Sequence, residues 1–338
     1  MNLKGKRVFV GLSGGVDSGV TAALLQEQGA TVIGVFIKGW YPPGMPCTWA
    51  EDRRDAMRVA AHLQIPFHTL DASLEYKQGV IDYLLAEYKA GRTPNPDIMC
   101  NREVKFGAFY RFAKEKGADY MATGHYARVE NGMLMRGIDP AKDQSYFLWA
   151  VPKEALDLTL MPLGDKRKDE TRRLAGKYGL PNAQKKDSQG ICFLGSISVE
   201  DFLRSEFGEQ ERGSAKDAEG NIVGTHTGSL FHTLGSRVAL EDAIPGPWYV
   251  VGKDMEKNEL FVSKERVTKT HSLTLREQNW FMKPEGTVQA QFRYHGPILE
   301  GEYTNVFTPL GSLPEPIALG QSLVLYKDNT VIGGGIIA

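Results

Sequence analysis

Residues 11–18, which read GLSGGVDS, contain the residue types needed to hold a phosphorylated ligand. Three glycines leave backbone N–H groups able to face an anion, two serine hydroxyls add donors, and Asp17 offers oxygen ligands to Mg²⁺. The loop lacks the lysine that a Walker loop uses in transferring a terminal phosphoryl group. This difference favours a reaction in which pyrophosphate is held and released. A tight turn without a ligand is the alternative interpretation.

Two later segments carry cysteines in polar loops. Residues 92–101 read RTPNPDIMCN, and the two prolines predict a rigid, extended loop that places Asp97 three positions before Cys100. Cys192 follows two lysines in KKDSQGICFLG, and nearby cations raise the thiolate fraction of a cysteine. A single cysteine is more often a buried small hydrophobe than a catalyst, and Cys47 is interpreted in that way. Two such loops downstream of a phosphate-binding loop favour thiol chemistry.

The elements that position these residues alternate over the first 200 residues. The pattern predicts strands at 6–12, 31–37, 67–70 and 119–123, and helices at 16–28, 51–63, 74–88 and 103–116. Alternating strands and helices indicate an α/β fold with a doubly wound parallel sheet, in which residues 11–18 join the first strand to the first helix. The last third predicts antiparallel strands instead, at 248–253, 259–264, 288–294, 323–326 and 331–332, typical of a small β-barrel.

Composition limits the classes of protein that fit. The 338 residues are enough for two or three domains, and the net charge of −1 restricts any nucleic-acid contact to a local patch. Residues 166–186 offer one, with eight Lys/Arg against two acids, although a solvated helix face is the alternative. No apolar run suits a membrane span or secretory signal, and three widely spaced cysteines suggest a reducing cytoplasm. The charged stretch 206–219 is the best candidate for a linker.

Six motifs occur in one order: GLSGGVDS, TPNPDIMCN (93–101), KFG (105–107), ATGHYAR (122–128), KDQSYFLW (142–149) and DSQGICFLG (187–195). In this order they resemble the tRNA-specific 2-thiouridylases of the PP-loop ATP pyrophosphatase superfamily. The resemblance covers most of residues 1–200 and becomes thinner beyond. It implies a catalytic PP-loop domain (1–198), a small central tRNA-binding linker domain (199–270) and a C-terminal antiparallel β-barrel domain (271–338). Residues 232–248 depart from the family, with Ser236 where members usually have glutamine.

The resemblance implies a tRNA-uridine 2-sulfurtransferase. ATP would adenylate the 2-oxygen of the wobble uridine in the anticodon loop and release pyrophosphate. Sulfur from a persulfide on Cys192 would then replace the activated oxygen. Cys100 would either attack that persulfide, giving a Cys100–Cys192 disulfide, or assist sulfur release, and Asp97 would act as general acid or base. ATP, Mg²⁺, tRNA and a persulfide sulfur-donor or relay protein are the implied cofactors and partners, with no membrane.

The same resemblance implies the binding residues. Those for ATP are Gly11, Leu12, Ser13, Gly14, Gly15, Val16, Asp17, Ser18, Ile37 and Gly124, with Asp17 also the metal ligand. Those for the tRNA are Asn95, Pro96, Asp97, His125, Lys142, Asp143, Gln144, Arg293, Tyr294 and Gln321.

Two other functions fit the same phosphate-binding loop. One is an enzyme that adenylates a different acceptor, as amide- and argininosuccinate-forming synthetases do. The other is an ATP-dependent tRNA-binding protein without turnover. The presence of both cysteines and Asp97 favours thiolation, because neither alternative requires a thiol.

Overall fold

The computed structural model describes residues 2–42, 49–187, 198–266 and 272–338. Its N-terminal unit is built on a parallel sheet with the strand order β3-β2-β1-β4-β7. This order, which begins in the middle of the sheet and continues on both sides, confirms the predicted doubly wound α/β fold. The strands are β1 (Arg7–Gly11), β2 (Thr31–Lys38), β3 (Phe67–Asp71), β4 (Tyr120–Ala122) and β7 (Thr159–Leu160).

Helices cover both faces of this sheet. Successive strand residues point to opposite sides, and here the residues on both sides are apolar and buried. Val8 and Val10 of β1 pack in one core with α1, α2 and α8, while Phe9 packs in the other with α3 to α6. The helical segments are α1 (Val16–Glu27), α2 (Trp49–His62), α3 (Ser73–Tyr76), η1 (Lys77–Asp82), α4 (Tyr83–Lys89), α5 (Pro96–Met99), η2 (Cys100–Ala108), α6 (Phe109–Glu115), η3 (Ser145–Leu148), α7 (Lys153–Asp157) and α8 (Lys168–Lys177).

Two of the predicted helices contain π-helical segments. The sequence predicts regular helices at 74–88 and 103–116, but η1 and η2 interrupt them with wider turns. A periodicity of 3.6 residues predicts the presence of a helix and not this widening, in which hydrogen bonds span five residues. Cys100 is the first residue of η2. Such wide turns are often found at functional sites.

The middle unit is a small sheet with one helix, α9 (Val199–Phe207). Its strands follow the order β10-β11-β12-β8-β9. The predicted hairpin at 248–253 and 259–264 is confirmed as the antiparallel pair β11–β12. The prediction of a linker at 206–219 is wrong in part, because β8 lies within it and pairs with β9 and β12. The strands are β8 (Gly213–Lys216), β9 (Ile222–His226), β10 (Arg237–Val238), β11 (Trp248–Asp254) and β12 (Glu259–Ser263), with a short turn η4 (Ser229–Phe231).

The C-terminal unit is the predicted antiparallel barrel. Its strands run in the order β13-β16-β15-β14-β17-β18, and pairing of β13 with β18 closes the ring. The predicted strands at 323–326 and 331–332 form the hairpin β17–β18, while the predicted strand at 288–294 ends earlier, at Gln291. The strands are β13 (Leu273–Trp280), β14 (Thr287–Gln291), β15 (Ile298–Tyr303), β16 (Val306–Pro309), β17 (Ser322–Lys327) and β18 (Thr330–Ile337).

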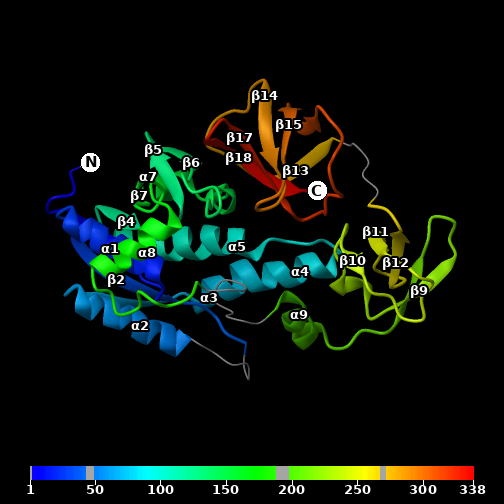
Figure 1. Cartoon of the computed structure of the whole chain (residues 1–338), viewed down its shortest axis with the longest axis horizontal. Helices are drawn as coiled ribbons and strands as arrows, with labels where there is room; N and C mark the ends of the chain where they lie inside the picture. The colour runs from blue at the N-terminus through cyan, green and yellow to red at the C-terminus, as the bar shows by residue number, and fades with distance from the viewer. Residues whose placement is uncertain (1, 43–48, 188–197, 267–271) are drawn as a thin grey trace.

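A hairpin of the N-terminal unit extends the sheet of the barrel. It consists of β5 (Ala127–Glu130) and β6 (Met133–Arg136), and Met135 of β6 pairs with Thr330 of β18. Figure 1 shows this hairpin beside the barrel, with α4 passing below toward the middle unit. One hydrophobic core includes Trp149 of the N-terminal unit, Tyr326 of the barrel and Phe202 of the middle unit. The three units therefore share buried surface.

We expect this shared core to make the three units unfold together. Trp149 has no exposed surface, so Trp149→Ala should lower the free energy of unfolding by about 3–5 kcal/mol. Calorimetry should show one transition that moves as a whole to lower temperature. The exposed Met57 of α2 provides the control, since Met57→Ala should change stability by no more than about 0.5 kcal/mol. Two transitions, of which only one moves, would contradict a shared core.

Candidate functional site

The loop at residues 11–18 joins β1 to α1 at the carboxyl edge of the parallel sheet. Gly14 has a φ of +79°, and an added Cβ would lie 2.4 Å from the carbonyl oxygen of Asp52, so only glycine fits there. The Ser18 hydroxyl accepts from the backbone N–H of Ser13 at 3.2 Å and donates to the carbonyl of Gly15 at 3.1 Å. These bonds hold the loop in a fixed turn before α1.

A lysine of α8 lies beside the loop. The ammonium of Lys168 lies 2.8 Å from each carboxylate oxygen of Asp17. Asp139 fixes the start of α8 by accepting the backbone N–H of Lys168 at 3.0 Å. The Tyr126 hydroxyl donates to the same Asp17 carboxylate at 2.9 Å, and burial together with Asp17 raises the pKa of Tyr126. A cation and a phenol therefore face the first turn of α1.

Asp187 joins this cluster from the other side. Lys168 lies 2.9 Å and Lys142 3.0 Å from its carboxylate, and Arg172 also donates to it. Burial opposes the charge on Asp187, but the hydrogen bonds and charges of Lys168 and Lys142 outweigh it and lower its pKa to about 2. Asp187 is the last described residue before the segment that carries Cys192. The residue just before that segment therefore binds the same Lys168 ammonium as Asp17 does.

The basic stretch at 166–186 is mostly paired with acids. Lys185, for example, lies 2.9 Å from Asp52 and 2.7 Å from Asp55 of α2. The stretch is therefore less available to RNA phosphates than its composition indicates. Six of its eight cations form ion pairs: Lys166, Lys168, Arg172, Arg173, Lys177 and Lys185.

The segment before Cys100 is partly extended and partly helical. The predicted extended loop ends at Asn95, whose side chain accepts the backbone N–H of Asp97 at 3.1 Å and caps α5. Pro96 is the first residue of α5, a position where proline is favoured because its missing N–H would be unpaired anyway. Asp97 is half-buried and Cys100 is fully buried. Cys47 and Cys192 lie outside the described residues, so the Cys100–Cys192 disulfide stays a prediction.

The residues after β4 connect the phosphate loop to the helix that begins at Cys100. An added Cβ at Gly124 would lie 3.0 Å from the backbone nitrogen of Ser18, so Gly124 lies against the loop. The ring of His125 packs 5.8 Å from Phe106 of η2, and its Nδ1 lies 2.9 Å from the Thr123 hydroxyl. Burial and, to a lesser degree, Lys105 lower the pKa of His125, which keeps the ring neutral. Ile37 is buried in β2.

The structure places the predicted tRNA residues in separate groups. Lys142, Asp143 and Gln144 are bonded within the N-terminal unit. Lys142 binds Asp187, Asp143 accepts the backbone N–H of Gly137 at 2.9 Å, and Gln144 accepts that of Tyr126 at 3.0 Å. The three in the barrel also have partners within the chain. Arg293 pairs with Glu315 at 2.9 Å, Tyr294 packs on Phe147, and Gln321 donates to the carbonyl of Thr93 at 2.7 Å.

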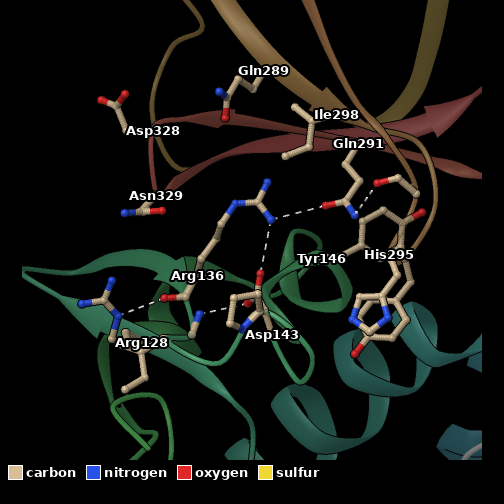
Figure 2. A pocket seen from close by; sticks show the side chains of 15 residues that line it. Arg128, Arg136, Asp143, Tyr146, Gln289, Gln291, His295, Ile298, Asp328 and Asn329 are labelled. Carbon is tan, nitrogen blue, oxygen red and sulfur yellow. Dashed lines mark hydrogen bonds and ion pairs between the residues drawn. The ribbon is translucent and has the colours of Figure 1, made fainter. Parts of the chain in front are cut away.

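A cavity of about 610 Å³ lies between the β5–β6 hairpin and the barrel, lined in part by Asp143 and Tyr294. Figure 2 shows Arg136 reaching across it, with hydrogen bonds to Asp143 at 3.3 Å and to Gln291 at 3.4 Å. The guanidinium also stacks 3.6 Å above the ring of Tyr326. Sequence reasoning missed Arg136, because two short strands and a long-range pairing bring it here.

Within the described ranges, no helix has both the length and the apolar character needed to span a membrane. The same residues include no group of three or more His, Cys, Asp or Glu side chains placed to hold a metal ion. A single carboxylate such as Asp17 still fits Mg²⁺, because proteins commonly bind this ion through one or two carboxylates and the phosphates of a substrate.

Three family models match the chain in succession: the tRNA methyl transferase HUP domain at residues 6–196, the tRNA methyl transferase PRC-barrel domain at 200–264 and the aminomethyltransferase beta-barrel domain at 270–337. A tRNA-specific 2-thiouridylase MnmA from Streptococcus agalactiae is 43% identical over 98% of this chain and 95% of its own length. The chain belongs to the tRNA-specific 2-thiouridylase family. Another member, from Vibrio cholerae, is 41% identical over 98% of this chain and 96% of its own.

Solved structures are more distant from this thiouridylase family member. A 4-thiouridine synthetase–RNA complex with bound ATP is 22% identical, with 57% of this chain and 46% of that chain covered and a TM-score of 0.38. The U34-tRNA thiolase NcsA from Methanococcus maripaludis is 18% identical, with 61% and 68% covered and a TM-score of 0.39. The family assignment therefore rests on the sequence relatives.

Gly14 and Gly15 give this thiouridylase family member a matched test of the loop geometry. Gly14→Ala should lower the free energy of unfolding by about 1–3 kcal/mol, because alanine is strained at a φ of +79° and its Cβ meets the Asp52 carbonyl. Gly15 has a φ of −83° and an added Cβ would contact only the Ser13 hydroxyl at 3.3 Å. Gly15→Ala should cost less, about 0.5–1 kcal/mol in urea denaturation, because the only penalty is that alanine is a poorer N-cap of α1 than glycine. Equal losses would show that the loop is not held as described.

Proposed function

We propose that this protein catalyses the ATP-dependent 2-thiolation of the wobble uridine of tRNA. The observation that carries the proposal is the match, at 43% identity over 98% of the chain, to a protein named tRNA-specific 2-thiouridylase. The phosphate-binding loop and the Asp17–Lys168 pair provide the chemistry that such a reaction requires. Among the alternatives, other adenylating enzymes would use the same loop but have no need of Cys100 and Cys192.

The loop supports the binding of the ATP phosphates. Its backbone N–H groups and hydroxyls lie at the N-terminus of α1, where the helix dipole favours an anion. Lys168 would bind the pyrophosphate end, since its ammonium already lies beside the first turn of that helix. Asp17 would hold Mg²⁺, which when bound would neutralise charge on the leaving pyrophosphate. Ile37 and Gly124 complete the proposed ATP contacts.

Adenylation makes the 2-oxygen of uracil easier to displace. The 2-oxygen of uracil attacks the α-phosphorus of ATP, a new O–P bond forms, and pyrophosphate departs. The oxygen is then bound to AMP, which is a far better leaving group than oxide. His125, neutral and buried beside the loop, and Asn95, Pro96 and Asp97, in the segment before Cys100, are the proposed contacts of the target base. Asp97 would move the proton as general acid or base.

Sulfur replaces the activated oxygen in the second half of the reaction. The outer sulfur of a Cys192 persulfide forms a bond to carbon 2, and AMP leaves with the former 2-oxygen. The Cys100 thiolate then attacks the Cys192 sulfur, which breaks the S–S bond, releases 2-thiouridine and leaves a Cys100–Cys192 disulfide. An external reductant restores both thiols, and a persulfide donor or relay protein reloads Cys192. The reaction belongs in the reducing cytoplasm.

The tRNA would lie across the hairpin and the barrel. The cavity there is lined by Asp143, Tyr294 and the cations Arg128 and Arg136, which suit a single-stranded loop with stacked bases and phosphates. Lys142, Gln144, Arg293 and Gln321 remain the other proposed tRNA contacts. Each has a bond within the chain, but Lys142, Arg293 and Gln144 have further hydrogen-bond donors that could bind RNA.

Removal of the ammonium beside Asp17 should impair adenylation. Lys168→Met should lower the rate of tRNA-dependent pyrophosphate release by about 100-fold, because a preorganised charge at the leaving group is lost. The control is Lys153→Met, which removes an exposed lysine paired with Asp157 and should change the rate less than about twofold. A Lys168→Met enzyme with the rate of the parent would remove Lys168 from the proposed mechanism.

The role of the thiols is tested by following 2-thiouridine in tRNA with ATP and a sulfur source. Cys100→Ser and Cys192→Ser should each abolish persulfide-dependent thiolation, and Cys47→Ser should retain it. Pyrophosphate release that persists in Cys192→Ser would separate adenylation from sulfur transfer. Full 2-thiouridine formation by Cys192→Ser would exclude the persulfide step. Turnover of another acceptor, with no thiolated tRNA from the parent, would favour the second class of adenylating enzyme.

A further inference from the structure

The segment that leads to Asp97 and Cys100 starts where the three units of the chain meet. The backbone N–H of Thr93 donates to the carbonyl of Leu319 at 2.8 Å, and its carbonyl accepts from Gln321 at 2.7 Å. Both partners belong to the barrel. The Thr93 hydroxyl donates to that of Thr233, in the middle unit, at 3.2 Å. One residue of the catalytic unit is therefore held by both of the other units.

The contact with the barrel is backbone to backbone. Gly320 has a φ of +88°, and an added Cβ there would lie 3.0 Å from the Thr93 nitrogen and 3.0 Å from the Arg92 side chain. No side chain separates the two loops at this point, so the barrel loop lies directly against residues 92 and 93.

A buried carboxylate adds a second link between the barrel and this segment. Glu87 of α4 is 4% exposed and binds the guanidinium of Arg92 through two hydrogen bonds of 2.9 and 2.7 Å. Arg276 of β13 donates to the same carboxylate from the barrel. Burial opposes the charge on Glu87, but Arg92 and Arg276 outweigh it and the pKa of the carboxyl is lowered. Glu87 is therefore charged, and it binds one guanidinium from the N-terminal unit and one from the barrel.

The other end of the segment is tied to the same strand of the barrel. Arg102, two positions after Cys100, donates to Glu277 at 3.1 Å, and Glu277 is next to Arg276. Residues 92 and 102 are thus both linked to adjacent residues of β13. The segment between them contains Asn95, Asp97 and Cys100, which have the proposed roles in base binding and thiol chemistry.

We propose that Glu87 is a positioning residue: with Arg92 and Arg276 it makes the placement of Asp97 and Cys100 depend on the docking of the barrel. It touches no reacting atom and acts through Arg92. The proposal rests on the proposed function for the roles of Asp97 and Cys100, but the linkage itself does not. A salt bridge that only stabilises the interface is the competing explanation, and the two make different predictions.

Arg276→Ala removes the bond between Glu87 and the barrel while leaving Glu87 paired with Arg92. The matched control is Asn279→Ala on the same strand, which removes hydrogen bonds of 2.7 and 3.1 Å to the carbonyls of Trp149 and Val151 at the same interface. Both variants lose barrel contacts, but only the first loses a bond to Glu87, the partner of Arg92. Arg276→Lys keeps a charge for Glu87 and serves as the conservative variant.

The first measurement is the rate at which iodoacetamide modifies Cys100 in the full-length protein carrying Cys47→Ser and Cys192→Ser. Cys100 has no exposed surface, so the parent should react slowly. Arg276→Ala should react about tenfold faster, because the segment that leads to Cys100 loses one of its links to the barrel and opens more often. Asn279→Ala should stay within about twofold of the parent, and Arg276→Lys should be intermediate. Melting temperatures of all variants confirm that each remains folded.

The second measurement is steady-state thiolation with all cysteines present. Arg276→Ala should lower kcat about tenfold, with the KM for tRNA and for ATP changed less than about twofold. Unchanged Cys100 reactivity in Arg276→Ala, or an equal rise in Asn279→Ala, would overturn the proposal. A raised KM for tRNA with unchanged kcat would make Arg276 a binding residue instead. If the parent forms no 2-thiouridine, the proposed function fails, while the Cys100 reactivity still decides the linkage.

Discussion

The ammonium of Lys168 between the carboxylates of Asp17 and Asp187 is the interaction on which the nucleotide side of this protein depends. A cation in the first turn of α8 opposes the dipole of that helix, so it is stable there because two carboxylates surround it. In a Walker loop the lysine belongs to the loop that binds the phosphates. Here it comes from a helix 151 positions away, and its placement depends on the whole sheet being folded.

This arrangement makes ligand binding an exchange of ionic partners. Before a triphosphate binds, the Asp17 oxygens are satisfied by Lys168 and Tyr126. A phosphate could take the ammonium and a divalent cation could take the carboxylate, so that each charge keeps an opposite charge. Asp187 shares the same ammonium, and any movement of Lys168 toward a phosphate changes the electrostatic environment at the root of the segment that carries Cys192. The proposed ATP site and the start of the segment that carries Cys192 therefore share one side chain, that of Lys168.

The local features of the chain were predictable from its sequence and the long-range ones were not. The loop, the parallel sheet and the barrel follow from residue types at short spacing. The π-helical turn at Cys100 and the pairing of β6 with β18 leave no clear local signal. The lysines of residues 166–186 were interpreted as an RNA patch, because spacing alone does not identify acids that approach from α2 or from the loop. Glu87, Arg92 and Arg276 were missed for the same reason.

The burial of Cys100 links the reactivity of its thiol to the contacts between the N-terminal unit and the barrel. A thiol with no exposed surface is protected from oxidants and from unproductive exchange, but it also cannot reach a second sulfur without movement of its surroundings. Its surroundings are held by Thr93, by Glu87 and by Arg102, and each of these is bonded to the barrel. The unit proposed to bind the RNA is therefore also the one whose displacement would release the thiol. Binding energy gained across the barrel could in this way be used at Cys100, where the covalent step is proposed to take place.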